Sequence, residues 1–515
     1  MTLTESRWIP SFEEILKFLR VFPIEIQKIY PSSFQQQDQL IYGLVRTGES
    51  KKLTVIGEKE VLFQDPFSGN IFHHSPSLKL CDLSLGNTLC LMERFPFTKP
   101  VPCLNHPITI GTGDRLGLAT PGQIRAIRKF RVRPILAQQS VRENHQTGRN
   151  FKEVIADAAW SVFQENYQEG YGADGDHLKS LGEVKVALDA GVSMITLDLS
   201  ETLNPEVLSM SGEKVEQKFR EEIDSEDARV ILHLFLDKEF IFRGCMGDLS
   251  IRFSEDEVKR NTLLFHRAID FSEEAYQWMM SQTGQKPLID LEISIDEIPV
   301  PTPPETHLFL TILLRHRGIR INSLAPRFIG EFQKGIDYRG EIQAFRKQFY
   351  HHSLIAKHYG EYKLSIHSGS DKFSIFPHIG EIAQGKIHLK TAGTSWLEAM
   401  RLIALKNPAL FKEMYCAALP AFTEASKLYQ VTTDLNRVPK PQHLNEQHLS
   451  LLLDKEDTRQ LLHITYGFLL KSPAKPFFFK TLTEYEEDYW SLLEHHIEKH
   501  LNGLGVERGD GLCKA

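Results

Sequence analysis

Eight short apolar runs between residues 107 and 395 constrain the fold of this chain more than any other feature. Each run is followed by a polar turn and then by a segment of helical length. The runs span residues 107–114, 133–140, 169–177, 193–200, 287–294, 319–328, 362–370 and 386–395. Apolar runs that alternate with helices are typical of parallel strands that are buried on both faces. Eight such units predict an α/β fold of the (β/α)8 TIM-like barrel type.

Two stretches fit this pattern less well. The third run, EGYGADGDH, is polar for a barrel strand, and residues 203–283 form a stretch far longer than one crossover helix requires. We interpret 203–283 as a helical insertion, because segments such as 257–269 place apolar residues at helical spacing. An open doubly wound sheet is the alternative fold.

The barrel is expected to carry additions at both ends. Residues 1–104 combine a helical pattern with short strand-like runs, which predicts an N-terminal α+β extension. Residues 105–406 would form the barrel, and residues 407–515 are predicted to be a C-terminal helical region with a glycine-rich tail. A packing or oligomerisation role is the simplest interpretation of the N-terminal extension, so a homo-oligomer stays open.

Charge and cysteine usage narrow the functional class. The net charge of −7 over 515 residues is spread along the chain, without the block of like charge typical of nucleic-acid or membrane-surface binding. No run approaches the roughly 18 consecutive apolar residues of a membrane helix. The six cysteines show no metal-site spacing, and the start MTLTESRWIP lacks the apolar core of a signal peptide. We therefore expect a cytoplasmic protein with a small-molecule partner.

Polar side chains end the apolar runs, where a barrel enzyme holds its active site. The carboxyl ends of the strands meet on one face of a barrel, so these side chains should converge on one pocket. The candidates for substrate binding are Arg115, Gln138, Ser140, Lys179 and Lys390. Such a mixture of cations and polar groups, close to carboxylates and imidazoles, is unusual for an ordinary surface.

His177 and His367 are candidates for binding a divalent cation. Each stands at the predicted mouth of a different strand, with an acidic residue close by in sequence. Neutral imidazole nitrogens suit such a cation, and a carboxylate or amide oxygen would complete an open site. Because no HExxH or comparable local signature is present, two hydrogen-bonded structural histidines stay open as the alternative.

Asp176 and Glu292 are the candidates for a base and an acid. A reaction that moves a proton on either face of a sugar carbon needs two titratable groups on opposite sides. Glu292 lies in the largely apolar run DLEIS, where an ionised carboxylate needs a partner such as a metal or a lysine. A salt-bridged structural carboxylate is the alternative for Glu292.

The loops that end the seventh and eighth runs, IHSGSDKF and LKTAGTS, are candidates for binding an anion. Glycine, serine and exposed backbone amides can form an anion-binding nest there, as in many barrels that hold phosphate. Lys372, Lys390 or Arg115 would supply the counter-charge for a phosphate or a carboxylate. Two ordinary glycine turns are the alternative.

Five longer strings carry a family resemblance. These strings are GTGDRLGLATPGQ, AQQSVREN, YGADGDHLKS, ITLDLSE and IHSGSDKF, and together with their surroundings (about residues 105–406) they resemble the bacterial tagaturonate epimerase family. The resemblance implies a barrel with a bound divalent metal, for which zinc, manganese, nickel and cobalt stay open. It also implies that Asp176 is the proton acceptor, that Glu292 is the proton donor, and that His177, Gln333 and His367 are the metal ligands.

The resemblance further implies interconversion of D-tagaturonate and D-fructuronate, two sugar acids that differ at C4. The C4 hydrogen is not acidified by the C2 carbonyl, so we expect retro-aldol cleavage between C3 and C4, rotation of the aldehyde and re-addition, with the cation as Lewis acid. A transient oxidation would need a nicotinamide, and no GxGxxG follows a predicted strand. Two alternatives stay open: a metal-dependent aldolase or epimerase of a phosphosugar, and a non-catalytic sugar-acid-binding barrel.

Overall fold

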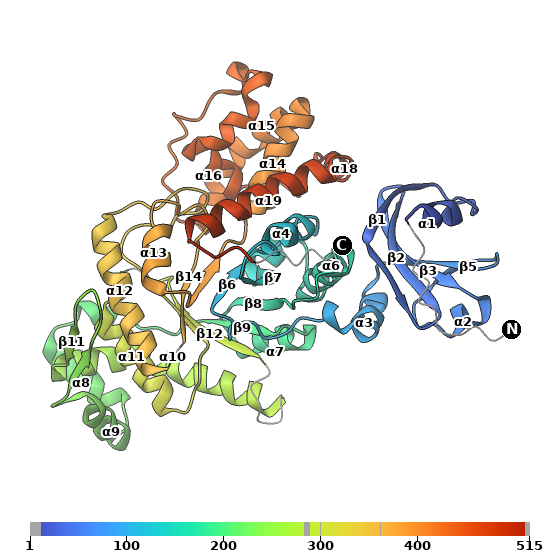
Figure 1. The fold of residues 1–515 in the computed structure, drawn as a ribbon. Coiled ribbons are helices and arrows are strands. Elements are labelled where there is room, and N and C mark those ends of the chain that lie inside the picture. Colours follow the sequence, from blue (N-terminus) through green and yellow to red (C-terminus); the bar gives the residue numbers. More distant parts are fainter. Residues whose placement is uncertain (1–11, 283–288, 299, 361, 510–515) are drawn as a thin grey trace.

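The computed structural model describes residues 12–282, 289–298, 300–360 and 362–509. Its centre is a closed barrel of eight parallel strands that follow one another in space as they do along the chain (Figure 1). The strands are β6 (Ile108–Gly111), β7 (Arg133–Ser140), β8 (Gly172–Leu178), β9 (Met194–Asp198), β12 (Asp290–Ile295), β13 (Ser323–Pro326), β14 (Lys363–Ile366) and β15 (Ile387–Lys390). Each predicted run overlaps one strand. The predicted (β/α)8 barrel is confirmed, and the open doubly wound sheet is excluded.

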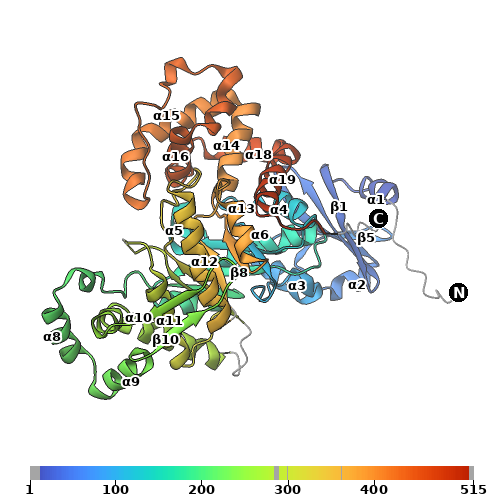
Figure 2. The same cartoon turned by 60° about the vertical axis from the view of Figure 1, so that its left-hand side comes forward.

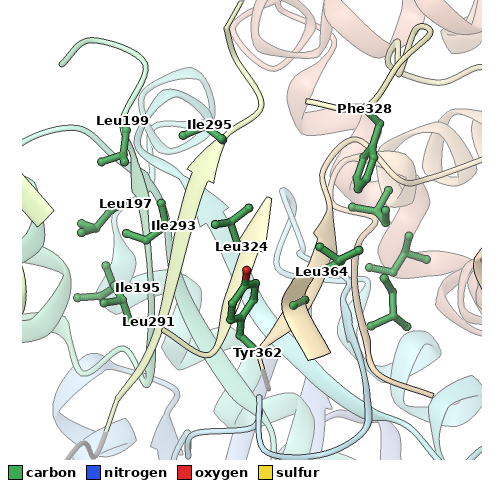
Figure 3. Close-up of a cluster of buried hydrophobic side chains, with 14 of the residues drawn as sticks. Ile195, Leu197, Leu199, Leu291, Ile293, Ile295, Leu324, Phe328, Tyr362 and Leu364 are labelled. Atoms are coloured by element: carbon green, nitrogen blue, oxygen red, sulfur yellow. The ribbon is translucent and has the colours of Figure 1, made fainter. Parts of the chain in front are cut away.

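Alternation along the strands separates an apolar outer face from a polar inner face. On β12, Leu291 and Ile293 pack beside Ile195 and Leu197 of β9 on the side of the helices (Figure 3). Burial of each such side chain contributes about 1.5–3 kcal/mol. Because successive strand residues point to opposite faces, Glu292 faces the barrel interior.

The polar third run is strand β8, and the barrel interior explains its composition. Asp174 and Asp176 are two residues apart, so they lie on the same face of the strand. Both carboxylates contact the Lys390 ammonium of β15, at 3.0 and 2.7 Å. The run is polar because it supplies the negative half of a buried ion cluster inside the barrel.

Helices cover the outside of the barrel. Seven of them lie between consecutive strands: α4 (Thr120–Ile127), α6 (Phe151–Gln164), α7 (Leu181–Ala190), α10 (Glu255–Gln282), α11 (Pro304–His316), α12 (Ile342–Tyr359) and α13 (Phe376–Ala383). The short helix α5 (Val141–Thr147) precedes α6. The eighth place, between α13 and α4, is filled by α19 (Glu486–Gly503) from the far end of the chain (Figure 1).

Helices α4 and α19 approach closely at Gly122. A Cβ atom at Gly122 would lie 2.8 Å from both Cα and the carbonyl oxygen of Trp490, and 3.1 Å from Cβ of Leu493. The indole Nε1 of Trp490 donates a hydrogen bond to the carbonyl oxygen of Leu118 at 2.9 Å. The absence of a side chain at Gly122 therefore lets α19 take the place of the eighth helix.

The long stretch between β9 and β12 is partly an insertion and partly a barrel helix. It contains η2 (Pro205–Ser209), α8 (Gly212–Glu222), α9 (Ser225–Phe235) and an antiparallel hairpin of β10 (Glu239–Phe242) and β11 (Leu249–Arg252). These elements lie on the side of the molecule away from the N-terminal sheet (Figures 1 and 2). Helix α10 packs against α7 and α11, so it is the fourth crossover helix and not part of the insertion.

The N-terminal extension is an antiparallel sheet of five strands in the order β1-β2-β3-β5-β4. Its elements are α1 (Phe12–Leu19), β1 (Ile26–Gln37), β2 (Leu40–Thr47), β3 (Ser50–Gly57), α2 (Lys59–Gln64), β4 (Gly69–Phe72), β5 (Ser77–Asp82), α3 (Leu85–Arg94) and η1 (Pro96–Thr98). Tyr42 and Leu44 of the sheet share one apolar core with Trp160 and Phe163 of α6. The extension is therefore packed onto the barrel.

The C-terminal region is helical, as predicted. Helix α14 (Thr394–Lys406) leads into it from β15, and its elements are α15 (Pro408–Ala425), η3 (Ser426–Leu428), η4 (Pro441–His443), η5 (Glu446–Asp454), α16 (Glu456–Ile464), α17 (Tyr466–Leu469), α18 (Lys475–Glu484) and α19. None of the helices in the described ranges is both long and apolar enough to cross a membrane. The start of the chain, residues 287–288 of the fifth run, and Cys513 with the end of the tail lie outside the described residues.

Candidate functional site

A cavity of about 500 Å³ opens at the carboxyl ends of the barrel strands. It is lined by residues at or just beyond the ends of β7, β8, β12, β13, β14 and β15, and by residues 427–430 of the C-terminal region. Among the residues predicted from the sequence, those that line it are Gln138, Ser140, Asp176, His177, His367 and Lys390. The predicted convergence on one pocket therefore holds for these six.

His177 and His367 meet in the cavity. Their ring centroids are 4.9 Å apart, with the rings nearly perpendicular. Asp296, just beyond β12, completes a group whose potential ligand atoms all lie within 4.8 Å of one another. Two imidazoles and one carboxylate with an open side are a donor set that suits a catalytic divalent cation.

Each histidine is held by a carboxylate from another strand of the barrel. Nδ1 of His177 lies 3.0 Å from Oδ2 of Asp198, and Nε2 of His367 lies 2.7 Å from Oε1 of Glu292. A carboxylate that holds one ring nitrogen fixes the ring and leaves the other nitrogen for a metal. The remaining nitrogen of His367, Nδ1, is buried and forms no well-directed hydrogen bond, although Asp296 Oδ1 is 3.0 Å away. Nδ1 of His367 and the carboxylate of Asp296 are therefore the neighbouring donors that would hold a cation.

The charges around the two histidines favour the binding of a cation. Burial acts to lower the pKa of His367, but the carboxylates of Asp296 and Glu292 outweigh it and raise the pKa to about 10. Burial would raise the pKa of Asp296, yet the adjacent His367 holds it well below the usual range. The carboxylates around the histidines are therefore ionised and would strengthen cation binding.

Lys390 is at the centre of an ion cluster in the barrel interior, beneath the cavity. Its ammonium lies 2.7 Å from Asp176 Oδ1, 2.8 Å from Glu292 Oε1 and 2.7 Å from Thr196 Oγ1. Burial opposes ionisation of Asp176 and Glu292, but the Lys390 charge outweighs it, so the pKa of each carboxyl is lowered. Asp174 differs, because its burial prevails over Lys390 and raises its pKa. The ion cluster links the predicted base and the predicted acid through one lysine.

Glu292 lies behind the cavity and not on its wall. The side chain is fully buried, and Ser323 Oγ donates to its Oε2 at 2.5 Å while His367 and Lys390 contact Oε1. Of the predicted acid and base, only Asp176 lines the cavity. Glu292 is therefore not positioned for direct contact with a substrate.

Two of the predicted substrate-binding residues lie outside the cavity wall. Arg115 forms an ion pair with Glu143, with its Nε donating at 2.8 Å, and its guanidinium lies 3.9 Å from the ring centroid of Tyr466. Lys179 lies 3.2 Å from Glu201 and 3.5 Å from Glu297. Both cations have acidic partners within the protein.

Gln138 and Ser140, in contrast, are placed as expected. Neither amide atom of Gln138 has a hydrogen-bond partner among the described residues, although the side chain is buried. The Ser140 hydroxyl accepts from the backbone N–H of Glu143 and so caps helix α5 at the cavity edge. Gln138 is therefore the stronger candidate for direct contact with a substrate.

Gln333 does not line the cavity, and its side chain is hydrogen-bonded to other residues of the protein. Its carbonyl oxygen accepts hydrogen bonds from Gln460 Nε2 and from both the backbone and the hydroxyl of Thr432, at 2.8–3.0 Å. Its amide nitrogen donates to Glu331 at 2.6 Å. The carbonyl oxygen is thus engaged with the C-terminal region and the amide nitrogen with Glu331, whereas Asp296 is the carboxylate that lies with the two histidines.

The seventh loop is also tied to the C-terminal helices. Lys372 donates to the backbone carbonyls of Gln333, Ile336 and Ser370, so its charge is unavailable to an external anion. Nε2 of His500 accepts the backbone N–H of Asp371 at 3.0 Å. This arrangement does not match the expected anion nest with Lys372 as counter-charge.

Comparison with known proteins identifies the group to which this site belongs. The model of the tagaturonate epimerase family (UxaE) matches residues 30–504. The chain belongs to the tagaturonate epimerase family. The resemblance seen in the sequence is confirmed, and membership makes the chain an isomerase.

Relatives in the tagaturonate epimerase family match over nearly the whole chain. The tagaturonate/fructuronate epimerase of Thermotoga maritima is 37% identical over 482 residues, which cover 93% of this chain and 97% of that protein. A glycerol-complexed crystal structure of the fructuronate-tagaturonate epimerase of Cohnella laeviribosi is 41% identical, with a TM-score of 0.88. That match covers 96% of this chain and 99% of the other, and the native crystal structure gives the same values.

The site of this tagaturonate epimerase family member contains residues that sequence reasoning did not select. Asp296 follows the run that was predicted to end at Ser294, because β12 continues to Ile295. The sequence signal was present, since Asp296 is the first acidic residue after the strand. Lys334 carried no such signal, because it lies in a long loop between β13 and α12.

Proposed function

We propose that this chain interconverts D-tagaturonate and D-fructuronate at C4, with a divalent cation held by His177, His367 and Asp296. The observation that carries the proposal is this group of three donors inside the cavity, with each imidazole held by its own carboxylate. Names of relatives that are 37% and 41% identical supply the two substrates.

The donor set also bears on the cation. Imidazole nitrogens and a carboxylate suit zinc, manganese, nickel or cobalt. Gln333 would have to give up three accepted hydrogen bonds to bind it, so Asp296 is proposed in its place. When bound, the cation supplies Lewis-acid polarisation of the substrate carbonyl.

The reaction proposed for this cavity is a retro-aldol cleavage followed by re-addition. Asp176 accepts the proton of the C4 hydroxyl, the C3–C4 bond breaks, and its electron pair moves toward the C2 carbonyl. The C4 aldehyde then rotates and presents its other face. Re-addition restores the C3–C4 bond with inverted C4, and the new C4 oxygen takes up a proton.

Lys390, and Glu292 on its far side from the cavity, support the proton exchange at Asp176. Lys390 lines the cavity and contacts both Asp176 and Glu292, so it can hold a proton between them. Glu292, expected as the proton donor, acts in this geometry through Lys390 and His367. It is then a positioning residue, because its own carboxylate does not reach the cavity.

The remaining alternatives have less support. A phosphosugar would need an anion nest with free cations, but Lys372 is occupied by backbone carbonyls. A non-catalytic sugar-acid binder would not need two histidines oriented by buried carboxylates. We also assign the reaction to the cytoplasm, since the five cysteines of the described residues are all unpaired, as is usual in a reducing compartment.

The deciding experiment follows purified protein with D-tagaturonate in D2O by NMR. The proposal expects D-fructuronate to form without deuterium at C4, because the C4–H bond is never broken. Deuterium at C4 would show direct deprotonation, and tightly bound nicotinamide would show transient oxidation. Either result overturns the retro-aldol route, and the absence of any conversion overturns the proposed function.

A further inference from the structure

Five lysine and arginine side chains line the cavity, and they differ in what their charges contact. Four of them have partners within the protein. These contacts are Lys390 with the buried carboxylates, Arg142 with Leu428 O at 3.3 Å and Glu297 at 3.7 Å, Arg327 with Ile298 O at 2.5 Å, and Lys427 with Glu424 at 2.7 Å. The fifth is Lys334.

The ammonium of Lys334 forms no ion pair and no hydrogen bond with any residue in the described part of the chain. The side chain is half-buried on the loop between β13 and α12, where it lines the cavity. Burial lowers the pKa of Lys334, the carboxylate of Glu143 acts against this, and the nearby charges of Arg142 and Arg115 lower the pKa further. A half-buried, unpaired cation next to other cations is costly unless an anion meets it.

Lys334 and the metal-binding group come from different elements of the cavity wall. The histidines come from the ends of β8 and β14, whereas Lys334 and Arg142 come from the β13–α12 loop and from α5. Carboxylates of the protein dominate around the histidines. These carboxylates balance the charge of the proposed cation, whereas no carboxylate of the described residues pairs with Lys334, so an anionic substrate group is attracted to the Lys334 side.

We propose that Lys334 binds the carboxylate of the sugar acid and thereby sets the preference for ketouronates over neutral ketoses. This inference rests on the proposed function. One ammonium group, with Arg142 nearby, matches the single charge of a carboxylate. A phosphate normally collects several donors, including backbone amides at a helix N-terminus.

The test compares Lys334→Met with the wild-type enzyme on three substrates: D-tagaturonate, D-tagatose and D-tagatose 6-phosphate. For D-tagaturonate, loss of a charge-assisted hydrogen bond should raise KM about 10- to 100-fold, with a smaller change in kcat. For D-tagatose, any turnover should change less than about threefold. Lys334→Arg should restore much of the affinity for D-tagaturonate, since it keeps the charge.

A binding measurement keeps the test independent of turnover. D-mannonate and D-mannitol differ only in having a carboxylate or a hydroxymethyl group, and neither contains a carbonyl that permits cleavage. Calorimetry should show that Lys334→Met weakens D-mannonate about tenfold or more and leaves D-mannitol unchanged. The matched control is Lys427→Met, because Lys427 lines the same cavity but is already paired with Glu424.

The outcomes are separable. An unchanged KM for D-tagaturonate in Lys334→Met, or an equal rise in Lys427→Met, overturns the role of Lys334. In the other contrary outcome, the wild-type enzyme prefers D-tagatose 6-phosphate to D-tagaturonate and loses this preference in Lys334→Met. That result would assign Lys334 to phosphate binding and overturn its assignment to the carboxylate. If the wild-type enzyme does not convert D-tagaturonate at all, it is the proposed function that fails, whatever the variant does.

Discussion

Nε2 of His367 lies 2.7 Å from Oε1 of Glu292, and a carboxylate oxygen can only accept, so the imidazole is anchored with Nδ1 turned toward Asp296. The anchor is rigid because Glu292 is itself fixed by Ser323 and Lys390. A histidine held in this way presents one defined nitrogen to a cation. Glu292 therefore orients His367, a role that does not require contact with a substrate.

Glu292→Gln should weaken metal binding about 10- to 100-fold and reduce kcat/KM by a similar factor. The amide keeps the shape, but its NH2 group must face either the Lys390 ammonium or a donor hydroxyl. Metal affinity by titration of the chelated protein, together with steady-state kinetics, checks this. Ser323→Ala removes only one supporting bond and should cost less than about tenfold. Normal metal affinity combined with lost turnover would instead favour Glu292 as a direct proton donor.

Removal of the metal should abolish epimerisation, and divalent cations should restore it. His177→Ala and His367→Ala should each purify with little metal and lose at least about a hundredfold in kcat/KM. Elemental analysis and turnover before and after chelation measure both effects. His316→Ala is the control, since His316 is exposed on α11. Full activity after complete metal removal would disprove the metal-dependent mechanism.

Asp176→Asn should reduce kcat by at least about a hundredfold, the usual scale for a general base. The substitution keeps the size of the side chain while removing the charge that pairs with Lys390. Circular dichroism and thermal unfolding distinguish lost catalysis from lost folding. Asp189→Asn, on the exposed face of α7, should behave as wild type. A non-catalytic binding protein would instead retain its function in the Asp176 variant.

Gly122→Ala should destabilise the protein by about 1–3 kcal/mol, because the added Cβ would lie 2.8 Å from the Trp490 backbone. The cost exceeds the gain of at most ~1 kcal/mol expected from helix propensity. Gly182→Ala is the matched control in α7, where the nearest neighbouring atom is 3.8 Å away. It should leave stability unchanged or raise it slightly. Denaturant unfolding of both variants decides whether the α4–α19 contact is as tight as described.

The barrel was predictable because parallel strands that are buried on both faces require continuous apolar runs. Each run can be recognised from a few consecutive residues. The third run was recognised by its place in the series and not by its composition, since Asp174 and Asp176 are polar for a reason found only across the barrel, at Lys390. The position of α19 was not predictable, because nothing in its own residues shows that it packs on α4.

The site was predictable in part for the same reason. Asp176 and His177 lie near the end of β8 and His367 directly follows β14, so strand topology alone brings them together. Gln333 and Lys334 lie in a long loop, where the backbone path decides which of two adjacent side chains faces the cavity. Arg115 was misplaced because its partner, Glu143, comes from another βα unit.

Helix α19 completes the ring around the strands although most of the barrel separates it from α4 in sequence. The nascent chain therefore exposes the flank beside α4 until α19 has been synthesised and has packed there. Products that lack α19 would display an uncovered hydrophobic strip, so synthesis of this helix acts as a checkpoint for assembly of the barrel.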